Sequence, residues 1–203
     1  MWWIKSVYST LGASNHSEYD RADNDFYATD PVVIWELFDK MKEHNETFAD
    51  VIREPATWNW HLAEELKKRR HGVMCTDIIQ REYKLNRVHD FLLDASNWTL
   101  KDTTMDIITN PPYKYAQAFV EKAISLLNTD RKVAFFLKLT FLEWQKRKKM
   151  FKDYPPKYVF VYSKRAKCAR NWEEEMFDKS SAVCYAWFVW VKWYKGNPII
   201  DRI

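Results

Sequence analysis

The sequence predicts a doubly wound α/β fold built on a mostly parallel sheet. Short apolar segments that read as strands alternate with segments of helical periodicity along the 203 residues, the pattern of helices that cross over between parallel strands. The segment 105–109 is apolar on both faces apart from Asp106, as expected of a central strand. With 47% apolar residues, a chain of this length can bury a substantial core and is expected to form one domain.

Each element is predicted from its periodicity and its boundary residues. Helices are predicted where apolar side chains recur on one stripe, and strands where short apolar runs end at turn residues. Pro31 suits the first turn of a helix and Gly72 suits a helix stop. The predicted helices are 31–43, 61–70, 115–127 and 141–151, and the predicted strands are 48–55, 73–76, 88–92, 105–109, 133–139, 158–162 and 182–191. Residues 1–24 are polar and irregular, so a loose N-terminal arm is expected before a single domain at 25–203.

Composition disfavours several classes of protein. No run of 18 or more uncharged apolar residues is present, and the first eleven residues lack the apolar core of a signal peptide. A cytoplasmic protein without membrane association is therefore expected. The three cysteines, Cys75, Cys168 and Cys184, form no CxxC pair, so neither a disulfide framework nor a zinc site is expected.

A rigid turn, Asn110-Pro111-Pro112-Tyr113, follows the strand 105–109. Two consecutive prolines fix two φ angles and remove two N–H donors, so neither strand nor helix can continue through them. The turn suits gripping a planar amino group, because the Asn110 side-chain oxygen and the Pro111 carbonyl can each accept one N–H. The ring of Tyr113 can stack on the group's own ring. A plain strand-to-helix turn is the alternative.

The tetrapeptide resembles the catalytic motif of amino-group methyltransferases that use S-adenosylmethionine, the DNA N6-adenine enzymes above all. Other segments resemble motifs of this family in the expected order, and the small phage-type enzymes are the most similar. These segments are 25–31, which contains Tyr27 and Thr29 and resembles the N-terminal cofactor motif; Glu54, Pro55 and Ala56 with Asn59, His61 and Leu62, which resemble the first Rossmann motif; Asp77, at the place of the ribose-binding acid; and Asp90, Phe91 and Leu92, which resemble the adenine-contacting motif.

The resemblance implies a Rossmann-like methyltransferase fold, with a mostly parallel seven-stranded sheet, an antiparallel last strand and helices on both faces. It implies methyl transfer from S-adenosylmethionine to the N6 amine of adenine in DNA, by a monomer or weak dimer that needs no metal. The implied catalytic residues are Asn110, Pro111, Pro112 and Tyr113, and the implied cofactor-binding residues are Tyr27, Thr29, Glu54, Pro55, Ala56, Trp58, Trp60, Asp77, Asp90 and Phe91. Methylation of RNA or of a protein glutamine, and a catalytically dead nucleic-acid-binding relative, are the alternatives.

A basic segment at 146–179 is the candidate surface for DNA. Between Lys146 and Arg170 the chain carries ten Lys or Arg residues against the single acid Asp153. Tyrosines are interleaved with these bases, as expected of a face that binds phosphates and stacks on bases. A solvated helix face is the alternative interpretation. The candidate nucleic-acid contacts are Lys146, Arg147, Lys148, Lys149, Lys164, Arg165, Lys167 and Arg170.

The first Rossmann motif departs from the family pattern, because Trp58 and Trp60 stand where the family has glycines. Their rings would fill volume that the cofactor needs. The chain has 3 glycines and 11 tryptophans, whereas about fourteen glycines would be typical at ~7%. We hypothesise that the source reads UGA as glycine, with Trp187 and Trp190 genuine and glycine in place of Trp58, Trp60, Trp144, Trp172 and Trp193. A degenerate relative that binds no cofactor, or deliberate mutation of this loop, would also explain the motif.

Overall fold

Strands alternate with helices along the chain. The computed structural model describes residues 27–30, 32–58, 61–93, 104–128, 130–143, 145–164, 168–170 and 183–203, so the predicted arm at 1–24 lies outside the described residues. The elements are β1 (Tyr27–Thr29), α2 (Val32–Glu43), β2 (Val51–Glu54), α3 (His61–Lys68), β3 (Gly72–Asp77), β4 (Arg87–Val88), β5 (Asp106–Thr109), α4 (Ala116–Leu126), β6 (Lys132–Lys138), α5 (Lys148–Asp153), β7 (Tyr158–Val161), β8 (Cys168–Arg170), β9 (Tyr185–Val191) and β10 (Ile199–Arg202).

Eight strands form one sheet in the order β10-β7-β9-β6-β5-β2-β3-β4, and β1 pairs with β8 apart from it. Within the large sheet, β9 runs antiparallel to β6 and β7, and the other pairings are parallel. The chain leaves β2 for β3 and β4 and then returns to β5 on the other side of β2. This reversal is the point where doubly wound sheets bind ligands. The predicted α/β class and the antiparallel last long strand are confirmed.

The sheet has one strand more than the seven predicted, because β10 adds to the edge beside β7. Its four residues include Asp201 and Arg202 and are largely exposed, so they carry no apolar periodicity. Backbone hydrogen bonds hold the strand instead, with Ile199 N donating to Lys157 O at 2.9 Å and Ile203 N to Val161 O at 2.9 Å.

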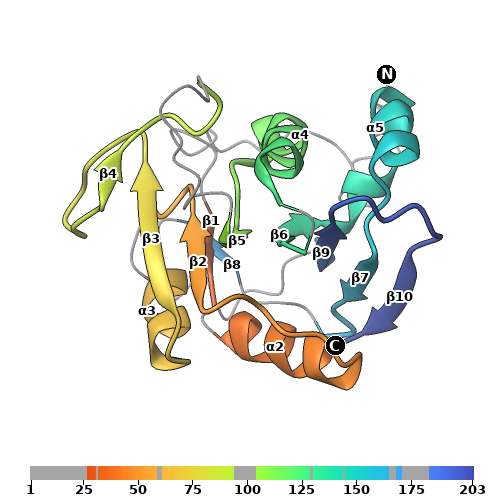
Figure 1. The fold of residues 1–203 in the computed structure, drawn as a ribbon, viewed down its shortest axis with the longest axis horizontal. Helices are drawn as coiled ribbons and strands as arrows, with labels where there is room; N and C mark the ends of the chain where they lie inside the picture. Colours follow the sequence, from red (N-terminus) through yellow and green to blue (C-terminus); the bar gives the residue numbers. More distant parts are fainter. Residues whose placement is uncertain are drawn as a thin grey trace, which may run out of the picture.

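Helices cover both faces of the sheet (Figure 1). On one face α2 and α3 pack against side chains that include Ile52, Phe136 and Trp187, all fully buried. On the other face α4 and α5 pack against residues such as Phe135 and Phe188. No helix in the described part of the chain has the length and apolar character needed to cross a bilayer.

Two predicted elements are wrong in extent. The predicted strand 88–92 is only the two residues of β4, because the Asp90 carboxylate accepts the Leu92 N–H at 2.8 Å and bends the chain into a turn. The predicted basic helix 141–151 is instead two 3₁₀ turns followed by the short α5. The Arg147 guanidinium donates to the Phe141 carbonyl at 2.8 Å, which would accept a backbone N–H in a continuous helix.

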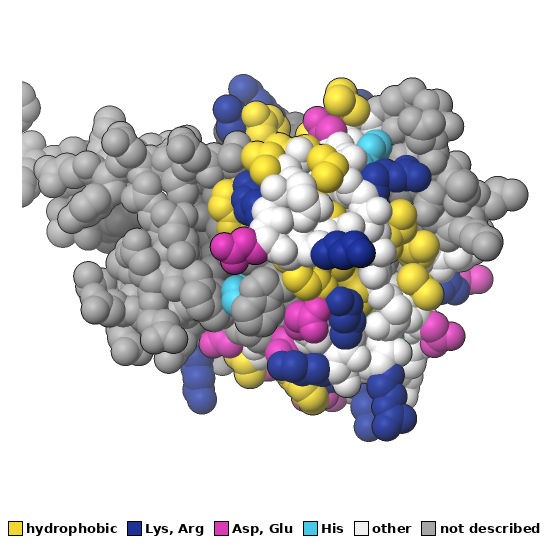
Figure 2. All heavy atoms as spheres, turned by 90° about the vertical axis from the view of Figure 1, so that its left-hand side faces the viewer, with side chains coloured by type: hydrophobic (Ala, Val, Ile, Leu, Met, Phe, Trp, Pro, Cys, Tyr) yellow, Lys and Arg dark blue, Asp and Glu magenta, His cyan; other side chains and the backbone are white. Residues whose placement is uncertain are grey.

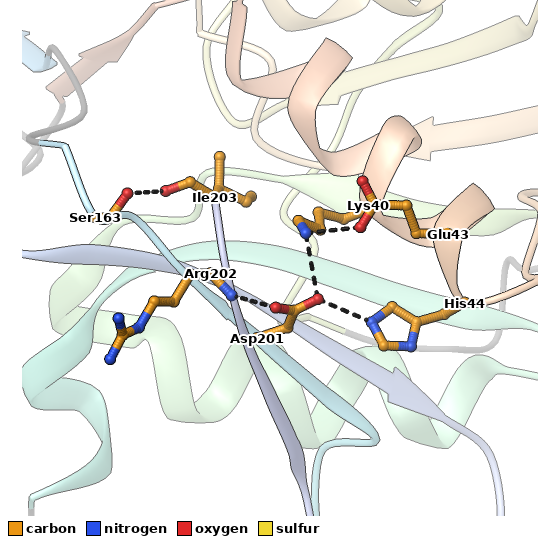
Figure 3. Close-up of polar contacts among 7 residues, drawn as sticks. All are labelled: Lys40, Glu43, His44, Ser163, Asp201, Arg202 and Ile203. Atoms are coloured by element: carbon orange, nitrogen blue, oxygen red, sulfur yellow. Dashed lines mark hydrogen bonds and ion pairs between the residues drawn. The ribbon is translucent and has the colours of Figure 1, made fainter.

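Two carboxylates, of Asp106 in β5 and Asp201 in β10, connect these strands to neighbouring parts of the fold. Asp106, the one charged residue of β5, is 1% exposed and accepts the N–H groups of Ala49 at 2.6 Å and Lys132 at 2.7 Å. Asp201 of β10 lies beside Lys40 at 3.3 Å and His44 at 3.2 Å, both from the end of α2 (Figure 3). The C-terminal strand is therefore tied to the helix layer as well as to β7.

Candidate functional site

A pocket of about 350 Å³ opens at the carboxyl ends of β2, β3 and β5, where the strand order reverses. Nearly all of the predicted cofactor and catalytic residues with described side chains contribute to its wall. The pocket is lined by Pro55, Ala56, Trp58, Asp77, Ile78, Arg81, Asp90, Phe91, Leu92, Asn110, Pro111, Pro112, Tyr115 and Phe119. Segments that are more than fifty residues apart in sequence are thus assembled into one site.

Asp77 orders the loops around this pocket. One carboxylate oxygen accepts the N–H of Trp58 at 2.9 Å, and the other accepts the N–H of Ile79 at 3.1 Å. Arg81 lies 3.5 Å from the same carboxylate, and its guanidinium carbon lies 3.3 Å from the centroid of the Trp58 ring. A carboxylate oxygen has two lone pairs, so Asp77 can hold these loops and still accept a ligand hydroxyl.

Glu54 lies beneath the pocket wall rather than in it. The side chain is 1% exposed, and its Oε2 has no hydrogen-bond partner among the described residues. Burial, with the charge of Asp77 as a second cause, raises the pKa of the Glu54 carboxyl well above its usual range. At a pH where exposed glutamates are ionised, this raised pKa favours the neutral form of the Glu54 carboxyl.

The Asn-Pro-Pro-Tyr turn separates two cavities. Asn110, Pro111 and Pro112 line the first pocket, whereas Tyr113 lines a second one of about 410 Å³. Pro112 is extended, with φ −55° and ψ 118°, and its carbonyl accepts the N–H of Tyr115 at 2.9 Å, which starts the 3₁₀ turn Tyr113–Tyr115. This geometry directs Tyr113 away from the residues that precede it.

The second pocket combines an aromatic face with charged groups. The Lys138 ammonium lies 4.7 Å from the centroid of the Tyr113 ring, and the ring of Tyr185, which is not part of the pocket lining, lies 6.2 Å from the Tyr113 ring. The remaining lining residues are Ala116, Leu137, Thr140, Phe141, Glu143 and Arg147. A planar ring with a phosphate attached would meet both stacking and positive charge here.

Some pocket residues were not predicted from the sequence. Ile78, Arg81, Tyr115 and Phe119 also line the first pocket, beside Leu92 of the predicted adenine-contacting motif. Tyr115 is half exposed, and an aromatic residue two positions after the proline turn was the available signal for it. Arg81 follows Asp77 by four residues, and this spacing in a loop does not predict that the two side chains lie together.

Several predicted site residues have no described side chain. Tyr27 and Thr29 lie in β1, which pairs with β8, and only their backbone is described. Trp60, Arg165 and Lys167 lie outside the described residues. Arg170 pairs with Tyr27 across the small sheet.

The described part of the basic segment divides into exposed and anchored cations. Lys146, Lys148, Lys149 and Lys164 are exposed, although Lys149 pairs with Asp153 at 2.7 Å. Arg147 is half buried against the Phe141 ring at 4.1 Å, and burial lowers the pKa of its guanidinium. On the opposite side of the molecule, around β3 and β4, Lys and Arg side chains lie among acidic and apolar ones (Figure 2).

The architecture matches solved methyltransferases. No family model and no curated protein matches the sequence. A protein of Listeria monocytogenes assigned as a class I S-adenosylmethionine-dependent methyltransferase superposes with a TM-score of 0.59 at 13% identity, covering 89% of this chain and 66% of that one. A protein of Pyrococcus horikoshii assigned as an RNA methyltransferase gives 0.57 at 11% identity, covering 91% and 95%. DrdV, solved in a complex with DNA, gives 0.53 at 13% identity, covering 89% of this chain and 28% of DrdV. The chain therefore has the Rossmann-like fold of class I S-adenosylmethionine-dependent methyltransferases.

Proposed function

We propose that the protein transfers the methyl group of S-adenosylmethionine to the N6 amine of adenine in DNA. The observation that carries the proposal is the position of the Asn-Pro-Pro-Tyr turn in the wall between two pockets. The first pocket, with Asp77 and Phe91, would take the cofactor, and the second, with Tyr113 and Lys138, would take the adenine nucleotide. The methyl group would cross at the turn.

The chemistry is a direct displacement. Bound S-adenosylmethionine would supply the methyl group. The lone pair of the adenine amine would form the N–C bond as the S–C bond breaks, the electrons of the S–C bond would stay on the sulfur of S-adenosylhomocysteine, and the amine would lose one proton to solvent. The Asn110 side-chain oxygen and the Pro111 carbonyl would accept the two N–H groups and stabilise the positive charge that develops on nitrogen. Tyr113 would replace the stacking lost when the base leaves the duplex.

DNA is favoured over a protein acceptor by the charge beside the second pocket. Lys138 and Arg147 line that pocket together with the acid Glu143, and the exposed lysines of the basic segment, which follow directly in the chain, supply the larger part of the positive charge. A phosphate backbone uses such cations, whereas a glutamine side chain does not. The second candidate is a nucleic-acid-binding relative without activity, favoured by the Trp58 ring in the first pocket.

The test is methyl transfer from labelled S-adenosylmethionine to duplex DNA, single-stranded DNA and RNA, followed by digestion to nucleosides. The chain itself and a Trp58→Gly/Trp60→Gly variant are both assayed. We expect N6-methyladenine in DNA, and Asn110→Ala in the active form should lower the rate about 100- to 1000-fold. Asn197→Ala, in an exposed loop, is the matched control. Label found only in RNA would overturn the proposal, and DNA binding without methyl transfer by every form would support the inactive relative.

A further inference from the structure

Two tryptophans of this chain have a backbone conformation that suits glycine. Within the described ranges, four non-glycine residues have positive φ: Asn45 at 57°, Trp58 at 44°, Arg70 at 68° and Trp193 at 66°. Asn45 and Arg70 follow the ends of α2 and α3, where a left-handed residue commonly terminates a helix. The two tryptophans end no helix, and this region is strongly disfavoured for a bulky side chain.

The described glycines do not use this conformation. Gly72 and Gly196 both have φ outside the range from +20° to +160°. The loop after β2 and the turn after β9 therefore hold tryptophan in a left-handed conformation that glycine ordinarily adopts, whereas Gly72 and Gly196 do not adopt it.

Trp193 occupies the third position of a tight turn. Tyr194 N donates to Val191 O at 3.1 Å, which closes a four-residue turn directly after β9. A positive φ at the third position is the feature that demands glycine in a type II turn. The side chain is 70% exposed, so burial of the indole does not compensate for the strain.

Trp58 occupies the loop between β2 and α3 and lines the first pocket. Its N–H binds Asp77, a contact that any residue can make through its backbone. Its ring instead stacks on Arg81 at the pocket wall. Without the indole, the pocket would gain volume directly beside Asp77, and the backbone would be free to keep its positive φ.

The other three described tryptophans behave as genuine tryptophans. Trp187 and Trp190 in β9 are at most 1% exposed, and their indole N–H groups donate to Val33 O at 3.0 Å and to Tyr154 O at 3.1 Å. Trp35 lies inside helix α2, where glycine would weaken the helix. Its indole donates to Glu65 at 2.8 Å and lies under the Arg69 guanidinium.

We propose that the functional protein carries glycine at positions 58 and 193, because UGA codons in its gene are read as glycine. Backbone conformation and packing give the same division of the described tryptophans. Trp58 and Trp193 stand at positions that suit glycine, whereas Trp35, Trp187 and Trp190 use their indole rings in packing and hydrogen bonds. A recoded codon explains two substitutions at unconnected sites, together with 3 glycines and 11 tryptophans in one chain. Position 193 lies outside both pockets of the candidate site, so that half of the inference does not depend on the proposed function. Position 58 deepens that function, since it makes the pocket competent for cofactor.

The test has a genetic and a physical part. The gene should carry UGA at codons 58 and 193 and UGG at codons 35, 187 and 190, and mass spectrometry of the protein purified from its source should find glycine at 58 and 193. Trp193→Gly should melt about 2–4 °C above Trp193→Ala, since both remove the indole and only glycine relieves the φ strain. Trp187→Gly, the control in β9, should melt well below the parent chain.

For position 58, calorimetry with S-adenosylhomocysteine compares Trp58→Gly with Trp58→Ala, each in a chain that also carries Trp60→Gly. We expect tighter binding by the glycine variant. UGG at codons 58 and 193 would overturn the recoding, and equal melting temperatures for the two Trp193 variants would overturn the conformational argument. Failure to bind cofactor despite UGA codons and a stabilised Trp193→Gly variant would count against the proposed function alone.

Discussion

Replacing Glu54 by glutamine should change how the stability of this protein depends on pH. The carboxyl is 1% exposed, and burial together with the charge of Asp77 raises its pKa well above the usual range. A raised pKa in the folded state means that the folded protein holds a proton that the unfolded chain has released. The stability that this proton contributes is fully present below the pKa of an unfolded glutamate, about 4.3. It is lost as the pH rises through the folded value.

The magnitude follows from a difference of one proton. Between the unfolded and folded pKa values, the free energy of unfolding should fall by up to about 1.4 kcal/mol per pH unit on account of Glu54 alone. Glutamine has nearly the same shape and no titrating proton, so Glu54→Gln removes this pH dependence. Every other titrating group contributes equally to both proteins.

The assay is urea unfolding of the parent chain and of Glu54→Gln at intervals from pH 4 to pH 8. As the pH rises, the stability of the parent chain should fall relative to that of Glu54→Gln. Glu82→Gln, an exposed glutamate beside the pocket loops, should follow the parent chain at every pH. Parallel curves for Glu54→Gln and the parent chain would refute a neutral buried carboxyl.

Cofactor binding should release the proton held by the Glu54 carboxyl. S-adenosylmethionine carries a sulfonium and an ammonium group, and positive charge brought near Glu54 favours its ionised form. Binding should therefore release up to one proton, which calorimetry in buffers of different ionisation enthalpy measures. Glu54→Gln should release less.

Three further changes have defined outcomes. Replacing the exposed lysines of the basic segment, Lys146, Lys148 and Lys149, by glutamine should reduce the slope of log affinity for DNA against log salt by roughly 0.9 for each phosphate that is no longer neutralised, and an unchanged slope would mark a solvated face. Tyr113→Phe should keep most of the methyl transfer rate, whereas Tyr113→Ala should lose it, because stacking on a flipped base needs the ring and contributes about 1–3 kcal/mol. Equal rates for Tyr113→Phe and Tyr113→Ala would exclude stacking by this residue. Asp201→Asn should lower the free energy of unfolding at pH 7 by up to about 1 kcal/mol. A backbone hydrogen bond and ion pairing lower the pKa of Asp201, so the difference should vanish as the pH falls through that lowered pKa in a urea titration extended below pH 4.

The local chemistry of the chain was sufficient to predict the sheet and the position of the central turn. The apolar run around Ile107 reads as a buried parallel strand whatever surrounds it, and Pro111 and Pro112 end it by removing backbone donors. These features depend on interactions within a few residues, so they can be read from the order of residues alone. The mismatch of Trp58 with a glycine motif can likewise be read from the order of residues alone.

Only the tertiary structure decided which side chains share a pocket. Tyr113 turns away from Asn110 because a 3₁₀ turn begins at Tyr113, and Tyr115 takes a place beside Asn110 instead. Arg81 joins the site through its contacts with Asp77 and Trp58, which come from two different loops. The strand β10 forms because the free edge of β7 needs hydrogen-bond partners, a demand that no periodicity within 199–202 expresses. Periodicity reports the burial of a segment, whereas the direction of a side chain at a loop depends on neighbours that are remote in sequence.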